Sequence, residues 1–484
     1  MGRAKQFAAN SFWLATSTVI IIFVGAIYRP IIGRILGPAD FGSYNFITTF
    51  IGYFLIIALF GVRQVVAREI GRDPGTARIF LLKSAKIRAF TILVSMIACC
   101  LIGYGLNRGH TVTLGIFIMS ISLAITGVGE LLEGVLIALA RSFYIAVSNL
   151  IGSLLRLGLG IWALEAGYGL IGVLWVFILT AGLSTVLNMV FTSYAIRLHK
   201  QKTTELAQTR YILKESIPFL VLSISTRLYA KSDILILTLL RGDKITGIYS
   251  AAYIFLDLLF AISHSITAVA YPMVTDMYVG SKGESEKSTA DLIMAYERLH
   301  KYMVLGLIPI SAILMSMGIE ILMLVFGRQY TGGTSLLQVL VWTAPVNISA
   351  NISGTFISAI YKQRLNTILA TAGMIVNIIW TIIFIALYGA MGAAIATLGS
   401  AVVNTIVHYY FVTRTIGSPS LINTWLKPII CGVIMVGAIY PLMDSFWLLR
   451  GVIGISAYII AIIIVRPFDA EDKRLVASVL TRKS

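Results

Sequence analysis

Charged side chains interrupt the apolar stretch SISTRLYAKSDILILTLL, residues 223–240, which otherwise has the composition of a transmembrane helix. Arg227 and Lys231 are four residues apart and so share one helical face, which Ser223 extends. Asp233 is six residues from Arg227 and points elsewhere. Intramembrane charges cost about 2.5–3.5 kcal/mol each at a helix centre and usually mark a function. Two cations on one face fit a doubly anionic group such as a pyrophosphate, which arginine grips with two hydrogen bonds and lysine as a point charge.

These two cations also admit a purely structural explanation. Asp257, in the next apolar segment, falls near the same membrane depth, and Asp233 follows on the same helix. Either carboxylate could form an ion pair with the cations, so both are also candidates for coupling or gating.

Other polar residues fall inside the predicted membrane segments. Arg156 lies in the outer half of its segment, either as a second station for phosphates or as a residue that reaches toward the outer interface. Glu130 and Glu133 are neighbours on one helix, where they either serve ion coupling or gating or stay protonated. Asn347 and Asn351 share a face after Pro345, which we expect to kink the helix, and can bind sugar hydroxyls or a neighbouring helix.

The elements that position these residues follow from composition. Hydrophobic residues make up 58% of the 484 and charged residues only 12%, with a mean hydropathy of +0.90. A soluble chain has roughly 25% charged residues, so this chain is predicted to be a membrane protein. We expect an all-α polytopic fold with fourteen transmembrane segments, at 8–34, 41–61, 82–106, 112–139, 144–165, 169–196, 215–240, 246–271, 300–319, 334–360, 365–387, 390–413, 425–443 and 446–466.

Lysine and arginine indicate the orientation. With the N-terminus in the cytoplasm, most of the 38 cations fall in cytoplasmic loops, as the positive-inside rule requires. An even number of segments then puts both termini on the cytoplasmic side of the cell membrane. The net charge of +17 is explained by contact with anionic membrane lipids, and no nucleic-acid partner is expected.

The chain repeats itself. LEAGYGLIGVLW at 164–175 is echoed by IALYGAMGAAIA at 385–396, and LGPADFGSYNF at 36–46 is answered by LRGDKITGIYSAAYIF at 240–255. The two halves therefore have the same topology, a plan in which a substrate site lies between lobes related by an axis along the membrane normal. We predict an N-terminal lobe at 1–205, a C-terminal lobe at 206–415, and two further helices with a cytoplasmic tail at 416–484.

The stretch GRILGPADFGSYNFITTF, between the first two segments, resembles the signature of Wzx-type polysaccharide flippases of the multidrug/oligosaccharidyl-lipid/polysaccharide (MOP) exporter superfamily. The fourteen segments, the six-plus-six halves and the trailing pair are similar to that family over the whole chain. The resemblance implies two lobes, as in the related MATE exporters, that alternate access. It also implies export of a polyprenyl-(pyro)phosphate-linked oligosaccharide from the inner to the outer leaflet for surface polysaccharide or glycan assembly.

Two alternative functions differ from this one in their chemistry. A cation-coupled multidrug or metabolite exporter of the same superfamily typically carries cationic cargo, which Arg227 and Lys231 would repel. A membrane glycosyltransferase or polymerase needs acid/base or metal-binding groups at a water-facing site, but the predicted outer loops are short and poor in carboxylates. We therefore expect a transporter rather than an enzyme. H⁺ or Na⁺ coupling is left open, and the sequence does not predict the oligomeric state.

No cofactor or bound metal is expected. The five histidines show no ligand spacing, and the chain has no G-x-x-x-x-G-K-[ST] loop that would cradle ATP phosphates. The three cysteines lie in apolar segments without pairing or metal spacing.

Overall fold

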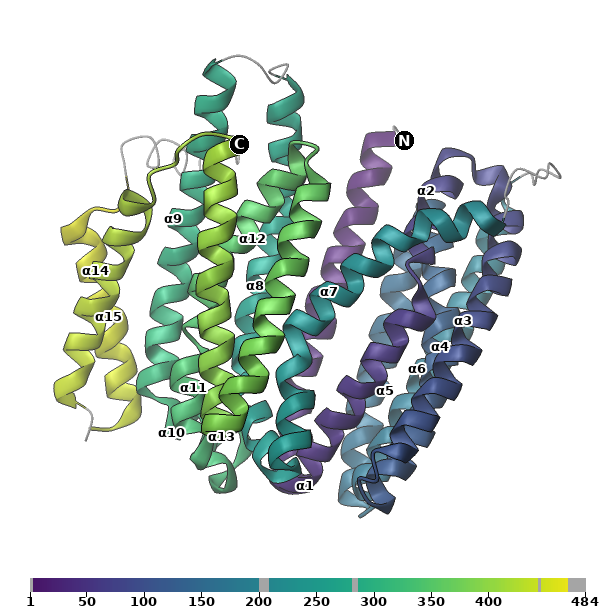
Figure 1. The fold of residues 1–484 in the computed structure, drawn as a ribbon, viewed down its shortest axis with the longest axis horizontal. Helices are drawn as coiled ribbons and strands as arrows, with labels where there is room; N and C mark the ends of the chain where they lie inside the picture. The colour runs from purple at the N-terminus through teal and green to yellow at the C-terminus, as the bar shows by residue number, and fades with distance from the viewer. Residues whose placement is uncertain (1–2, 200–208, 281–285, 443–444, 469–484) are drawn as a thin grey trace. The chain divides into compact units, whose positions relative to one another are not determined.

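The protein is all-helical in its computed structural model, which describes residues 3–199, 209–280, 286–442 and 445–468; these ranges contain no strand (Figure 1). The α-helices are α1 (Arg3–Leu59), α2 (Val62–Arg72), α3 (Ala77–Gly105), α4 (His110–Ala138), α5 (Ser142–Glu165), α6 (Gly169–Arg197), α7 (Thr209–Arg241), α8 (Asp243–Gly280), α9 (Glu286–Ser316), α10 (Gly318–Phe326), α11 (Thr334–Leu340), α12 (Thr343–Ala359), α13 (Gln363–Thr415), α14 (Leu421–Ile439) and α15 (Trp447–Val465). Short 3₁₀ turns lie at Pro74–Thr76, Arg328–Gly333 and Tyr440–Leu442.

The predicted membrane segments map onto these helices with a few differences. Ten helices of the described chain are long and apolar enough to cross a membrane; α7, which holds the segment predicted at 215–240, is not among them. Two of them, α1 and α13, each join two predicted segments across a glycine with non-helical backbone angles. The segment predicted at 334–360 is instead divided into α11 and α12. Pro345 lies in the first turn of α12, where proline is tolerated, so it begins a helix rather than kinking one.

Two compact units make up the chain: Met1–Ala251 with Thr381–Ala390, and Ala252–Trp380 with Met391–Ser484. In the first unit, α4 packs between α3 and α6, α5 packs on α1 and α6, and α7 packs along α1 (Figure 1). Its core includes an aromatic ladder on the second half of α1, formed by Phe46, Phe50 and Phe54. The lobe boundaries expected from the repeat stay a prediction.

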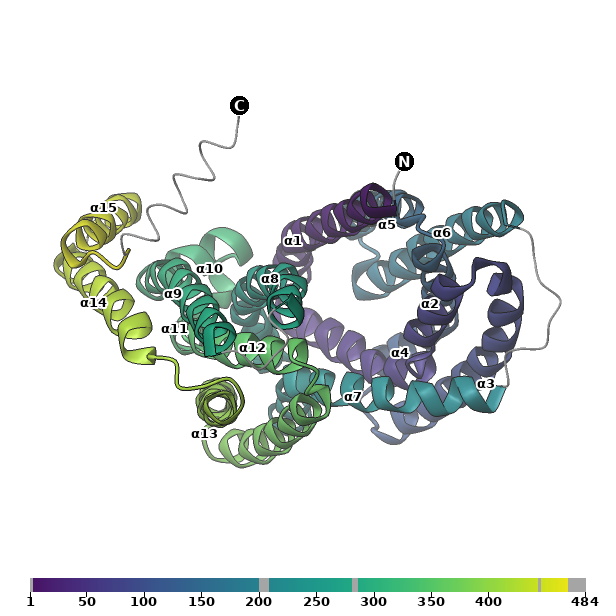
Figure 2. The ribbon, with the colours of Figure 1, turned by 90° about the horizontal axis from the view of Figure 1, so that it is seen from above.

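In the second unit, α14 packs on both α15 and α9 (Figure 2). Arg450 of α15 is buried and pairs with Glu320 of α10, and the Tyr458 hydroxyl donates to the carbonyl of Leu305 at 2.7 Å. The trailing helices are therefore fixed to this unit by polar contacts as well as by apolar packing.

The backbone supports the predicted repeat. Gly37 and Gly242, at equivalent places in the two halves, have φ of 78° and 85°. Gly169 and Gly389, the second equivalent pair, have φ of 55° and 61°. These left-handed values favour glycine because it has no Cβ to clash, so the repeated glycines mark equivalent helix junctions.

A further pair of repeated glycines lies where α1 and α8 cross. A Cβ on Gly42 would lie 1.8 Å from the carbonyl oxygen of Asp243, and one on Gly247 would lie 1.8 Å from that of Pro38. The two copies of the motif thus bring their backbones into direct contact, which any larger residue would prevent.

Gly42→Ala and Gly247→Ala are each expected to destabilise the protein by about 1–3 kcal/mol, because each new methyl group meets rigid backbone rather than a side chain that can turn away. The measurement is the unfolding midpoint of the purified protein in detergent. Gly158→Ala on α5 is the matched control, since a Cβ there meets nothing within 4 Å. Equal midpoints for all three variants would contradict the close crossing.

Candidate functional site

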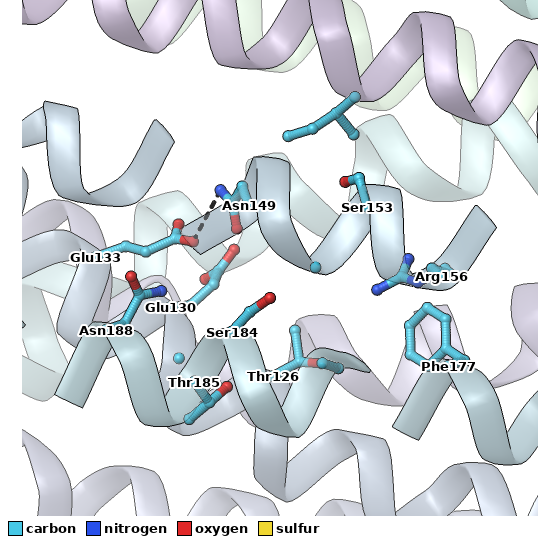
Figure 3. Close-up of a pocket in the computed structure, with 14 residues that line it drawn as sticks. Thr126, Glu130, Glu133, Asn149, Ser153, Arg156, Phe177, Ser184, Thr185 and Asn188 are labelled. Carbon is cyan, nitrogen blue, oxygen red and sulfur yellow. Dashed lines mark hydrogen bonds between the residues drawn. The ribbon is translucent and has the colours of Figure 1, made fainter. Parts of the chain in front are cut away.

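A cavity of about 220 Å³ lies within the first compact unit, between α4, α5 and α6 (Figure 3). Nine of its fourteen lining residues carry polar side chains. The lining residues are Ile21, Thr126, Gly129, Glu130, Glu133, Asn149, Gly152, Ser153, Arg156, Phe177, Ala181, Ser184, Thr185 and Asn188. Glu130 and Glu133, which the sequence singled out as a pair, therefore share one cavity with Arg156, to which it gave a different role.

The acidic end of this cavity is built on α4. Arg63, at the start of α2, reaches both carboxylates, with its Nη1 3.5 Å from Glu130 and its Nη2 3.4 Å from Glu133. The amide of Asn149 donates to Glu133 at 3.4 Å (Figure 3). The side chains of Glu130 and Glu133 are 28% and 16% exposed. The acidic pair is thus bridged by a cation from another helix.

The basic end is formed by Arg156 on α5. Its Nε donates to the hydroxyl of Thr180 at 3.2 Å, and its guanidinium lies 4.3 Å from the ring centroid of Phe177, in cation–π contact (Figure 3). Asn149 lies seven residues earlier on the same helix, so about 10 Å separates the two ends along the helix axis. The cavity is polarised, with carboxylates at one end and a guanidinium at the other.

Helix α7 carries the other predicted site residues of this unit. A Cβ on Gly52 of α1 would lie 2.3 Å from Nη2 of Arg227, so the guanidinium packs where α1 has no side chain. Lys231 and Ser223 are half-buried. Asp233 is buried, and it accepts hydrogen bonds from the Tyr249 hydroxyl at 2.6 Å and from the backbone N–H of Ile234 at 2.8 Å. The hydrogen bond from Tyr249 links Asp233 to α8.

Helix α2 is attached to the start of α7. Arg68 donates to Glu215 at 2.8 Å, and the hydroxyl of Tyr211 donates to Glu69 at 3.1 Å. The hydrogen bond with Glu215 raises the pKa of the Arg68 guanidinium above its ordinary value. One short helix therefore contacts the acidic end of the cavity through Arg63 and contacts α7 through Arg68.

The remaining predicted residues belong to the second unit. The amide of Asn351 donates to Oδ1 of Asn347 at 3.0 Å, so these two α12 residues bind one another. Asn347 is buried and Asn351 is half-buried. Asp257 on α8 is half-buried.

Sequence reasoning missed three residues here: Asn149 and Asn188, which line the cavity, and Arg63, which pairs with two residues that line it. The predictions from sequence assign none of them a role. Their only sequence signal is their polarity. The two asparagines lie in mainly apolar segments, and Arg63 comes just after the predicted segment 41–61. Among the described residues no three His, Cys, Asp or Glu side chains gather as a metal-binding group would require.

Comparison with known proteins adds a relative and solved structures. A probable low-salt glycan biosynthesis flippase, Agl15 of Haloferax volcanii, is 24% identical over 413 residues, 84% of this chain and 82% of the relative. A structure of the lipid II flippase MurJ in an inward closed conformation matches with a TM-score of 0.75 and 18% identity, covering 95% of this chain and 98% of that one. An inward-facing multidrug resistance MATE family transporter of the MOP superfamily matches with a TM-score of 0.66 and 16% identity, covering 82% of this chain and 94% of that one. The fold is therefore of the MurJ and MATE type.

The family model described as polysaccharide biosynthesis protein matches residues 7–278, more than half of the chain. That range contains the polarised cavity and all of α7. The chain thus belongs to the polysaccharide biosynthesis protein family of multi-pass membrane proteins.

Proposed function

We propose that this protein is a flippase. It moves a polyprenyl-(pyro)phosphate-linked oligosaccharide from the inner to the outer leaflet of the cell membrane, with both of its own termini in the cytoplasm. It transports its cargo without converting it chemically. Support comes from the family and from the glycan flippase relative, which aligns over most of both chains.

One observation carries the proposal: within the range that matches the family, Arg227 and Lys231 lie four residues apart on α7, and Arg156 lies in α5, which is apolar enough to span a membrane. A cation in hydrocarbon is costly unless it binds an anion or faces water. The phosphates of a lipid-linked sugar supply such an anion, and they lie where the polar headgroup meets the lipid tail.

The mechanism is alternating access between lobes 1–205 and 206–415. The headgroup enters from the cytoplasmic side, and the phosphates bind Arg227 and Lys231 with Ser223 at the same face. Arg156 offers a second station nearer the outer leaflet. Asn347 and Asn351 can exchange their mutual hydrogen bond for sugar hydroxyls, and the lipid tail stays in the bilayer throughout.

A cation-coupled multidrug exporter is the second candidate, because a MATE transporter shares the fold over 82% of this chain. The acidic end of the cavity would suit its coupling ion or cationic cargo. The face formed by Arg227 and Lys231 would repel that cargo by like charge, which ranks this function second.

The discriminating measurement is the thermal stability of the purified protein. A short-chain polyprenyl-pyrophosphate sugar is expected to raise Tm saturably, by roughly 5 °C at a large excess over Kd, because it binds only the folded state. The double variant Arg227→Ala/Lys231→Ala should lose this rise. The control ligand is an alkyl glycoside that lacks phosphate. A rise with cationic drugs but none with the lipid-linked sugar would favour the exporter.

A further inference from the structure

The two carboxylates at the acidic end of the cavity can accept more hydrogen bonds than the neighbouring side chains donate to them. Charge-assisted hydrogen bonds are normally about 2.7–2.9 Å long, and Arg68 meets Glu215 at 2.8 Å in the same unit. The contacts of Arg63 with Glu130 and Glu133 are longer, at 3.5 and 3.4 Å, as is the 3.4 Å contact from Asn149. Each carboxylate can accept about four hydrogen bonds, so both retain unused capacity.

Asn188 is an independent indication that this end of the cavity can bind a ligand. Its side chain is 2% exposed, it lines this cavity from α6, and its Oδ1 has no hydrogen-bond partner among the described residues (Figure 3). A buried carbonyl oxygen left unsatisfied is costly, so such groups are almost always paired. Glu130, Glu133, Asn149 and Asn188 together present an all-oxygen acceptor set.

Charge limits which ligand fits. Oxygen donors select hard cations, and two carboxylates without a third acidic group are too few for a dedicated divalent site. Two cations already lie near the carboxylates: Arg63, and the buried Arg88 of α3, whose Cδ is 3.6 Å from where a Cβ on Gly127 would lie, one turn before Glu130. Arg156 lies at the other end of the cavity. A further positive charge is therefore favourable only if it is monovalent and if one arginine withdraws.

Arg63 is the arginine that can withdraw. Its side chain is 29% exposed, whereas Arg88 is 1% exposed and donates to the carbonyl of Ala58 at 3.0 Å. Arg63 also stands two residues after Gly61, in a junction where Phe60 and Gly61 both have positive φ, of 48° and 67°. A short turn thus separates Arg63 from α1, and the partial exposure of its side chain leaves it in contact with solvent.

We propose that Glu130, Glu133, Asn149 and Asn188 form a binding site for Na⁺, and that Arg63 is a tethered cation that competes with Na⁺ for it. Release of Arg63 breaks two ion pairs between α2 and α4, and α2 transmits the change to α7 through the contact of Arg68 with Glu215. The transport coupling rests on the proposed flippase function, whereas Na⁺ binding itself does not.

The test measures Tm of the full-length protein in detergent as NaCl replaces KCl or choline chloride at constant ionic strength. Na⁺ is expected to raise Tm saturably by several degrees, and Glu133→Gln and Asn188→Ala should abolish the rise. Arg63→Ala should lower the apparent Kd for Na⁺ about tenfold, since it removes the competing charge. Glu165→Gln, at the exposed outer end of α5, is the matched control and should respond like wild type.

Three results would overturn the proposal: equal effects of Na⁺, K⁺ and choline; an unchanged Na⁺ response in Asn188→Ala; or the same stabilisation from lower pH with none added by Na⁺, which would identify a proton site. Asn188→Ala keeps every charge, so it serves as the test if Glu133→Gln fails to fold. No lipid-linked sugar is present in the assay. Failure of Na⁺ binding therefore leaves the flippase proposal intact, and failure of the sugar-lipid assay leaves the Na⁺ site intact.

Discussion

Arg227→Ala and Lys231→Ala are each expected to lower the transport rate about 10- to 100-fold, and the double variant should be inactive. A hydrogen bond between charged groups is worth about 1.5–3 kcal/mol. In the proposed mechanism these hydrogen bonds are made to the cargo phosphates, which pass Arg227 and Lys231 on the way from one leaflet to the other. The measurement is the appearance of a labelled polyprenyl-pyrophosphate sugar in the outer leaflet of proteoliposomes. Arg227→Lys should retain part of the transport rate, because lysine keeps the positive charge but cannot make the bidentate hydrogen bonds of arginine to a phosphate.

The matched control is Lys214→Ala. Lys214 lies on the same helix but is exposed near its N-terminal end, so its loss removes one positive charge without touching the proposed site. It should transport at close to the wild-type rate. If Arg227→Ala and Lys231→Ala instead fail to accumulate as folded protein, the two cations are structural. If they fold and transport normally, the phosphate site lies elsewhere.

The sequence predicted the fold well because membrane helices have a distinctive composition. Twenty apolar residues in a row have few other uses, and the repeated Tyr-Gly and Gly-x-Tyr motifs fall at junctions that share positive φ in both halves. The errors arose at boundaries. At Gly37 and Gly389 the chain passes from one helix into the next through a kink with no intervening loop, so two predicted segments are continuous in α1 and again in α13.

The site was harder to predict than the fold. Glu130 and Glu133 were identified as a pair and Arg156 on its own, because charges in an apolar segment stand out. Their common cavity depends on how α4, α5 and α6 pack, and Arg63 comes from 67 residues before Glu130. Periodicity reports which residues share a face of one helix, but it carries no information about which faces of different helices meet.

The acidic pair explains why Arg63 matters in two ways. As a structural bridge, it holds Glu130 and Glu133 together, three residues apart on α4, where like charges would otherwise repel. As a tethered cation, it makes the same site responsive to ions. Both roles require that the ion pairs of Arg63 with the two carboxylates be of intermediate strength. Their N···O distances of 3.5 and 3.4 Å and the partial exposure of the side chains meet that requirement.

Arg63→Ala is expected to destabilise the protein by about 2 kcal/mol at low Na⁺. This lies between the roughly 3–5 kcal/mol of a fully buried pair and the roughly 0–1 kcal/mol of a surface pair, since the three side chains are 16–29% exposed. Adding Glu133→Gln should recover about half of the loss by removing the repulsion between the carboxylates. The measurement is the free energy of unfolding in mixed micelles. Arg72→Ala is the control: Arg72 is on the same helix and contacts Glu69 at 3.3 Å but is 68% exposed, so its loss should cost less than about 0.5 kcal/mol. Equal losses for Arg63→Ala and Arg72→Ala, or strict additivity with Glu133→Gln, would show that Arg63 does not bridge the acidic pair.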